Sequence, residues 1–285
     1  MHDMKIAVVL GGTRGIGRAL AKSLATSWRG NGTVYLTARK QSDGKETADA
    51  LKAEGADVDS LLFDLVDSDA ATRVAEVLRT RHGGVDIVVQ NGAYMARAGV
   101  PAADDARPMI EANSHGTLRV LRSFLPILRE NGRMIVVASS FGVLRSLPAH
   151  LRERFITTSG DPDAINRAMD DYVAAVEAGT AESDGWPDWA NIVSKVGQVA
   201  VTRAFARWAK QTGALPAGVL INAANPGLTL TEATRDFMGT IFKREDAQTP
   251  EEAALGLHWL ATLPDGNSEP FGELVGNRHV IPFGD

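Results

Sequence analysis

Cysteine is absent from the 285 residues of this chain, so disulfide bonds, thiolate zinc sites and cysteine nucleophiles are excluded. Positive charge is not in excess either: the formal net charge is −5, whereas a nucleic-acid surface needs clustered Lys and Arg. No apolar run approaches the roughly 20 residues that span a bilayer, and the N-terminal segment lacks the pattern of a secretion signal. We therefore expect a cytoplasmic protein without membrane or nucleic-acid partners.

Two kinds of catalytic motif are also missing. The sequence has no His-Glu-x-x-His pair and no carboxylates at the spacing of a metal-binding loop, so we expect no metal. Ser139 and Ser140 lack the Gly-x-Ser-x-Gly elbow of an α/β-hydrolase, which argues against hydrolase activity. What remains is an ordinary globular composition, 44% hydrophobic and 23% charged, which predicts a folded chain.

Short apolar runs alternate with segments of helical period along most of the chain. Almost all residues of the strand-like runs are apolar. These runs are residues 6–10, 34–36, 61–63, 87–89, 134–137 and 219–222. This pattern predicts an α/β fold of the Rossmann type, a doubly wound parallel sheet with helices on both faces. The length suits a single domain over residues 1–285. Residues 271–275 are predicted to form the last strand, which closes the sheet edge.

One segment, residues 141–189, is too long for an ordinary connection between a strand and a helix. Within it, Asp161 and Pro162 are a typical helix start, and apolar residues from Ile165 to Val176 fall on one helical face before Gly179. We predict a helical insertion that packs on the domain. It is either a surface addition or a wall of the substrate cleft, and Trp186 and Trp189 either line that cleft or pack beneath it.

The first strand runs into a glycine-rich turn and then into a helix. This turn reads Gly11, Gly12, Thr13, Arg14, Gly15, Ile16 and Gly17. Glycines let the backbone approach a pyrophosphate, and the free N–H groups at the helix start attract an anion. Since the turn directly follows the first strand, it predicts a dinucleotide site.

The end of the second strand carries no acid that would hydrogen-bond a ribose 2′-hydroxyl. It reads Thr37-Ala38-Arg39-Lys40, where Arg39 can grip a 2′-phosphate and Thr37 can add a hydroxyl, with Arg14 nearby in the glycine turn. This pattern favours NADP(H) over NAD(H). Alternatively, Arg39 and Lys40 are a solvated pair of charges.

Taken together, these segments resemble the short-chain dehydrogenase/reductase family over nearly the whole chain. The matching positions are Gly11, Gly15 and Gly17, Asp64 followed by Leu65, Asn91 with Gly92, Asn113, Ser140, Lys195, and Pro226 with Gly227 before Thr231. The resemblance implies that Asp64 and Leu65 contact the adenine, and that Asn91, Gly92, Pro226, Gly227, Thr231 and Lys195 bind the cofactor. It also implies that Asn113, Ser140 and Lys195 belong to the catalytic set.

The run from Gly185 to Lys195 is most similar to the carbonyl reductase members of the family, which are usually monomeric and carry a helical insertion. Here Asn191 stands where their Tyr-x-x-x-Lys motif has Tyr. In the family this Tyr delivers a proton while hydride reaches the carbonyl carbon. An Asn amide donates a hydrogen bond but releases no proton near neutral pH.

Three functions remain open. First, an NADPH-dependent reductase takes the proton from a relocated acid. Tyr94 is the best candidate, and Tyr172, His115 and Asp188 are weaker ones. Alternatively, Tyr94 is an aromatic side chain that packs at the strand end. Second, the substrate is an iminium ion, which needs no proton. Third, the fold catalyses a non-redox reaction, as a cyclase, dehydratase or isomerase, or acts as an NADP(H) sensor. We rank the reductase of a small-molecule carbonyl or iminium group first, and we expect a monomer, with a dimer as the alternative.

Overall fold

The computed structural model describes residues 4–97, 99–157 and 160–284. Within these residues the strands are β1 (Lys5–Leu10), β2 (Gly32–Ala38), β3 (Val58–Leu62), β4 (Val85–Gln90), β5 (Leu128–Val137), β6 (Leu220–Asn225), β7 (Leu274–Gly276) and β8 (His279–Ile281). The helices are α1 (Gly15–Trp28), α2 (Gln41–Ala53), α3 (Ala70–His82), α4 (Ala102–Ile110), α5 (Gly116–Phe124), α6 (Ala149–Thr157), α7 (Pro162–Ala178), α8 (Ala190–Gln211) and α9 (Pro250–Ala261). A π-helical turn, Glu111–His115, joins α4 to α5.

The strands form one sheet in the order β3-β2-β1-β4-β5-β6-β7-β8. Neighbouring strands from β3 to β7 are parallel, as the alternation of strands and helices predicted. The strand order reverses between β1 and β4, and the carboxyl ends of these strands are where an open α/β sheet binds its ligand. The predicted Rossmann-type fold is therefore confirmed.

The sheet edge differs from the prediction that residues 271–275 close it. The strand there is β7, and a further strand, β8, pairs with it in antiparallel fashion. Asn277 and Arg278 form the connecting turn, and both have positive φ, 49° and 64°. Such turns usually carry Gly at the second position. Because Arg278 stands at this position instead of Gly, the sequence pattern did not predict this hairpin.

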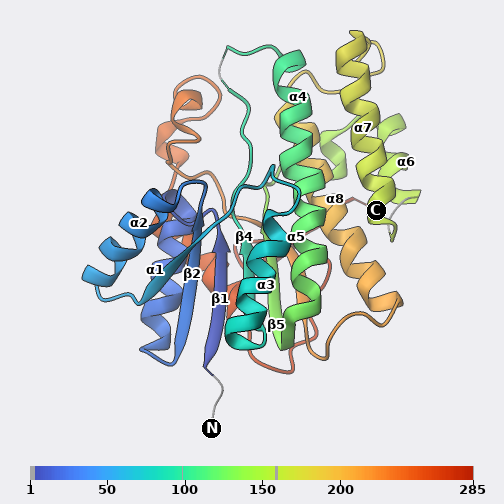
Figure 1. Cartoon of the computed structure of the whole chain (residues 1–285). Coiled ribbons are helices and arrows are strands. Elements are labelled where there is room, and N and C mark those ends of the chain that lie inside the picture. Colours follow the sequence, from blue (N-terminus) through green and yellow to red (C-terminus); the bar gives the residue numbers. More distant parts are fainter. Residues whose placement is uncertain (1–3, 98, 158–159, 285) are drawn as a thin grey trace.

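Both faces of the sheet are covered by helices (Figure 1), which explains why strand segments such as residues 6–10 and 134–137 are apolar. Alternate residues of β1 enter different cores: Ile6, Val8 and Leu10 pack with α3, α5 and α8, whereas Ala7 and Val9 pack with α1, α2 and α9. In a strand, successive side chains point to opposite faces. The two cores fix the carboxyl ends of the strands relative to the helices that follow them.

The predicted helix after Asp161 is α7. Its Asp161 carboxylate accepts hydrogen bonds from the N–H groups of Asp163 and Ala164, and Gly179 ends the helix with φ 72°. Helix α7 packs against α4 and α8, and α6 lies beside it (Figure 1). The segment between β5 and α8 therefore adds a helical layer outside the helices that cover the sheet.

Candidate active site

The turn between β1 and α1 is built from glycines that pack on neighbouring backbone. Gly11 and Gly15 have positive φ, 84° and 52°, which favours glycine. A Cβ on Gly11 would lie 2.8 Å from the Cα of Gly92, and one on Gly17 would lie 2.2 Å from the Gly11 carbonyl oxygen. Any larger residue at these positions would push the turn apart.

The start of α1 presents backbone N–H groups that no side chain caps. Arg14 is the N-cap residue, in an extended conformation, and the structure gives it no side-chain capping bond. The first N–H groups of a helix have no partner within the helix, and the helix dipole makes this end positive. Thr13 and Ile16 lie on the same turn and are partly exposed. The turn is therefore suited to a phosphate group.

Thr37 has a different position from the one expected for a ligand of a 2′-phosphate. Its side chain is buried, and its hydroxyl accepts a hydrogen bond from the N–H of Gly11 at 2.9 Å. A buried hydroxyl that already binds the backbone cannot reach a phosphate at the rim. The prediction for Thr37 is corrected: it holds the glycine turn in place.

Two arginines lie at the rim of this turn. Arg39 follows β2 and is exposed, and it forms no ion pair within the part of the chain that the structure describes. Arg14 is also exposed, but its guanidinium pairs with Glu232 on the loop after β6. Of these two arginines, Arg39 is available to a phosphate at once, whereas Arg14 must first break its ion pair with Glu232.

The residues after β4 and β6 close around the same turn. The Asn91 side chain donates a hydrogen bond to the Gly11 carbonyl at 2.8 Å, and Gly92 lies against Gly11. On the other side, a Cβ on Gly15 would lie 3.3 Å from the methyl carbon of Thr231. The structure therefore brings these sequence-predicted residues together. Pro226 and Gly227 lead into this loop, and Gln248 donates to the Pro226 carbonyl.

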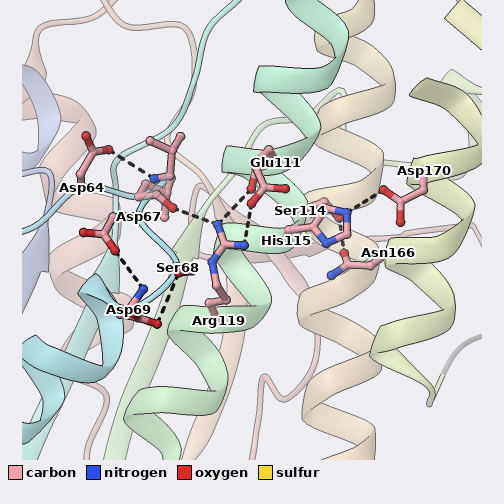
Figure 2. A network of polar contacts seen from close by, with 12 residues as sticks. Asp64, Asp67, Ser68, Asp69, Glu111, Ser114, His115, Arg119, Asn166 and Asp170 are labelled. Atoms are coloured by element: carbon pink, nitrogen blue, oxygen red, sulfur yellow. Dashed lines mark hydrogen bonds and ion pairs between the residues drawn. The ribbon is translucent and has the colours of Figure 1, made fainter. Parts of the chain in front are cut away.

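Asp64 and Leu65 follow β3, and Asp64 is labelled in Figure 2. The Asp64 carboxylate accepts a hydrogen bond from the N–H of Val66 at 3.3 Å, and the Leu65 carbonyl accepts one from Arg119 at 3.2 Å. Both residues are partly exposed, so a ligand can reach them.

Asn113 joins the strand end of β4 to α8. Its side-chain oxygen accepts from the N–H of Tyr94, and its amide donates to the Tyr94 carbonyl and to the Ser194 hydroxyl, each at 2.8 Å. Asn113 is fully buried on the π-helical turn. Its observed contacts hold the loop after β4 against α8.

One face of α8 carries three buried polar residues at helical spacing: Asn191, Lys195 and Gln198. The Lys195 ammonium donates to the Gln198 side-chain oxygen at 2.8 Å. Burial lowers the pKa of Lys195 from 10.5 to about 8, because an apolar environment disfavours the charged form. The Asn191 side-chain oxygen and the Gln198 side-chain nitrogen are buried without a hydrogen-bond partner.

Ser140 lies beside this face, in the turn after β5. The turn packs closely on α8, since a Cβ on Gly142 would lie 2.7 Å from the Lys195 carbonyl oxygen. The Ser140 side chain is exposed. The structure thus brings Ser140 to the same end of α8 as Asn191 and Lys195, with its hydroxyl open to a ligand.

Four aromatic side chains meet next to Ser140 and Asn191. The Trp189 ring lies 5.5 Å from Phe141, 6.0 Å from Phe237 and 6.3 Å from Phe242, between ring centroids. Phe141, Trp189 and Phe242 remain partly exposed. Trp189 therefore forms part of an apolar wall beside the site, whereas Trp186 is buried against Tyr172.

Four side chains are candidates for the proton donor that a tyrosine at position 191 would provide. Each has a bond or a setting that bears on this role. Tyr94 donates its hydroxyl proton to Asp105 at 2.9 Å, and burial together with this bond raises the pKa of Tyr94. Burial raises the pKa of Tyr172 to about 12. The His115 ring pairs with Asp170 at 2.9 Å (Figure 2), and Asp188 is exposed. A raised pKa makes a tyrosine a weaker acid, which argues against Tyr94 as the proton donor.

No group of three His, Asp or Glu side chains that could hold a metal occurs among residues 4–97, 99–157 and 160–284. None of the helices in these ranges is both long enough and apolar enough to cross a bilayer.

Comparison with known proteins agrees with this geometry. The family described as "short chain dehydrogenase" matches residues 5–149. The chain is 31% identical to the mouse protein "Carbonyl reductase [NADPH] 3", with 97% of each chain covered. This chain belongs to the short-chain dehydrogenase family. The human protein "Carbonyl reductase [NADPH] 1" is 29% identical to it, over 96% of this chain and 97% of that one.

Two solved structures share the fold of this short-chain dehydrogenase. Salutaridine reductase from Papaver somniferum superposes with a TM-score of 0.79 at 22% identity, covering 95% of this chain and 99% of its own. Menthone neomenthol reductase from Mentha piperita gives a TM-score of 0.75 at 23% identity, covering 95% and 98%.

Several residues that surround the site of this short-chain dehydrogenase were not predicted. The spacing of Gln198 does give a signal, because it lies three residues after Lys195 and seven after Asn191, on one helical face. Glu232 gave no signal, because its partner Arg14 lies 218 residues away in the sequence. Asp105 lies 11 residues after Tyr94, across a loop whose path the sequence does not give. The aromatic wall also joins segments far apart in the sequence.

Proposed function

We propose that this short-chain dehydrogenase is an NADPH-dependent reductase of a carbonyl or iminium group on a small organic molecule. The observation that carries the proposal is the set of groups that follow the carboxyl ends of the strands: an uncapped glycine turn after β1, the exposed Arg39 after β2, and the buried Lys195 on α8, which packs against the turn after β5. Two carbonyl reductases that are similar to it carry NADPH in their names. This similarity supports the same cofactor here.

The residues present fit an NADP(H) molecule. The turn from Gly11 to Gly17, with Thr13, Arg14 and Ile16, offers the N–H groups for the pyrophosphate. Arg39 would bind the 2′-phosphate, Asp64 and Leu65 the adenine, and Asn91 with Gly92 the neighbouring ribose. Lys195, Pro226, Gly227 and Thr231 would hold the nicotinamide end. When bound, this cofactor supplies a hydride to the substrate carbon.

The protein's own contribution is to orient the substrate oxygen or nitrogen. The Ser140 hydroxyl is exposed at the end of α8 and can donate a hydrogen bond to it. Asn191, which we place at the position of the family's tyrosine, can donate through its amide but gives no proton. Asn113 keeps the loop of Tyr94 against α8. The proton source is therefore atypical for the family.

A substrate screen followed by NADPH absorbance tests this function. Ketones, quinones and cyclic iminium salts are added to the protein with NADPH, and substrate-dependent loss of absorbance is the expected result. Product formation that is equal with NADP⁺ or without cofactor would instead support the non-redox alternatives, a cyclase, dehydratase or isomerase. Binding of NADP(H) with no turnover of any kind would leave only the sensor role.

We further propose a cytoplasmic monomer. Helix α7 packs on α4 and α8, and helices in this region carry subunit contacts in other members of the family. Sedimentation velocity is expected to give a mass near 30.4 kDa. A stable dimer or tetramer would overturn this part of the proposal.

A further inference from the structure

The Lys195 ammonium has protons that the protein does not use. It carries three N–H donors, and the structure pairs the group with one acceptor, the Gln198 side-chain oxygen at 2.8 Å. No carboxylate pairs with Lys195 in the part of the chain that the structure describes. A cation held by a neutral amide in an apolar setting gives up a proton more readily than one held by a carboxylate.

A buried acceptor lies one helical turn before this ammonium. The Asn191 side-chain oxygen has less than 1 Å² of exposed surface and no hydrogen-bond partner among the described residues. Leaving a buried acceptor unpaired is unfavourable, so such atoms usually receive a ligand or an ordered water. Asn191 and Lys195 are four residues apart on α8 and share one face.

The other titratable groups on the elements packed around this face are committed elsewhere. Tyr94 binds Asp105 and His115 binds Asp170. Tyr172 on α7 packs on Trp186, and burial raises its pKa to about 12. Burial lowers the pKa of Lys195 to about 8, nearer to neutral pH than the ordinary 10.5 of a lysine. A general acid works best when its pKa lies near the working pH.

We propose that Lys195 supplies the proton to the substrate oxygen, through a water molecule that the Asn191 side-chain oxygen holds. This inference rests on the proposed reductase function and names its proton source. In the step, the nicotinamide cofactor gives a hydride to the carbonyl carbon and is oxidised, while the C=O double bond becomes a C–O single bond. The oxygen takes a proton from the water, which takes one from Lys195; the neutral amine then recovers a proton from solvent.

Gln198 is a positioning residue in this scheme. Its oxygen stabilises the charged form of Lys195, so removing that oxygen should lower the pKa of Lys195. A carboxylate in its place should raise this pKa by about 1–3 units. Gln198→Leu and Gln198→Glu therefore form a matched pair with opposite expected effects.

The first test measures Lys195 without cofactor. In protein with ¹⁵Nζ-labelled lysine, the resonance absent from Lys195→Arg is followed by NMR from pH 6 to 11. We expect a midpoint near 8, shifted down in Gln198→Leu and up in Gln198→Glu. A wild-type midpoint near the ordinary 10.5, or no shift in either variant, would overturn the proposal.

The second test measures turnover of acetophenone, cyclohexanone and phenanthrenequinone with NADPH. The wild-type kcat is expected to fall above about pH 8, and the fall should move with the two Gln198 variants. Lys195→Ala should lose about 10² to 10⁴ in kcat. Methylammonium should restore part of this rate, whereas tetramethylammonium, which has no proton to give, should not.

The exposed lysine at the end of the same helix provides the matched control, because Lys210→Ala should match the wild type. Circular dichroism and NADPH titration report whether Lys195→Ala folds and binds cofactor. Equal rescue by both ammonium ions, or no rescue in a folded variant that binds NADPH, would overturn the role of Lys195 but not the proposed reductase function. Wild-type protein that neither binds NADPH nor consumes it would overturn the proposed function as well.

Discussion

We predict that the choice between NADPH and NADH depends on Arg39, which is exposed directly after β2. Arg39 is exposed beside the glycine turn and unpaired among the described residues, whereas Arg14 is paired with Glu232. NADPH carries a 2′-phosphate that NADH lacks, so a contact from Arg39 affects only NADPH. We predict that Arg39→Ala weakens NADPH binding and leaves NADH binding unchanged.

The size of this effect follows from the exposure of Arg39. A hydrogen bond to a charged group contributes about 1.5–3 kcal/mol, and screening by solvent places an exposed contact at the lower end of that range. About 1.5 kcal/mol corresponds to roughly tenfold in Kd. The dissociation constant for NADPH should therefore rise about tenfold in Arg39→Ala.

Glu232 gives the opposite test. The Arg14–Glu232 pair is more than half exposed on both sides, 65% and 55%, so breaking it costs the protein little. Glu232→Gln frees Arg14 for the phosphate and removes a nearby negative charge. NADPH should bind up to about fivefold more tightly, since exposed pairs contribute at most about 1 kcal/mol.

Isothermal titration with NADPH and NADH measures both effects, with Lys45→Ala as a control of equal charge change on the neighbouring helix α2. Arg39→Ala should alter the NADPH/NADH ratio, and Lys45→Ala should not. Equal weakening for the two cofactors in Arg39→Ala would show that Arg39 does not bind the 2′-phosphate. In that case the reasoning from the end of β2 fails.

Four further outcomes are expected. Gly17→Ala should abolish tight NADPH binding in calorimetry, because its Cβ would lie 2.2 Å from a carbonyl oxygen of the turn; retained affinity would contradict the geometry. Asn191→Tyr should raise ketone reduction, since it restores a phenolic acid, and an unchanged kcat/KM would mean that the pocket has been rebuilt. Tyr94→Phe should lose less than about tenfold in kcat because its proton is held by Asp105, well below the 10² or more of a lost general acid. Asp161→Ala removes the cap of α7 and should cost about 0.5–2 kcal/mol in urea unfolding; no loss would mean that the cap is not formed.

Local sequence signals predicted the parts of the fold that depend on local physics. The glycine turn, the apolar strands and helix α7 each carry their own pattern, and α7 begins and ends at the expected residues. The β7–β8 hairpin was missed because its turn has Arg278 where glycine is usual. A backbone strained in this way leaves no trace in a hydrophobic pattern.

The sequence named candidate site residues but not their contacts. Asn91 meets Gly11 and Thr231 meets Gly15, yet Thr37 points into the turn rather than toward a phosphate. The direction of a side chain at a strand end depends on the register of the strand, which the sequence alone does not give. The bond from Tyr94 to Asp105 likewise depends on how the loop after β4 folds back on α4.

Transfer of deuterium tests the central claim most directly. The protein is mixed with NADPH carrying one deuterium at the transferable position of C4, together with the best ketone of the screen, and the alcohol is analysed by mass spectrometry. The account predicts one deuterium on the carbinol carbon for each NADPH consumed. A product without deuterium, or formed with no loss of NADPH, would contradict it.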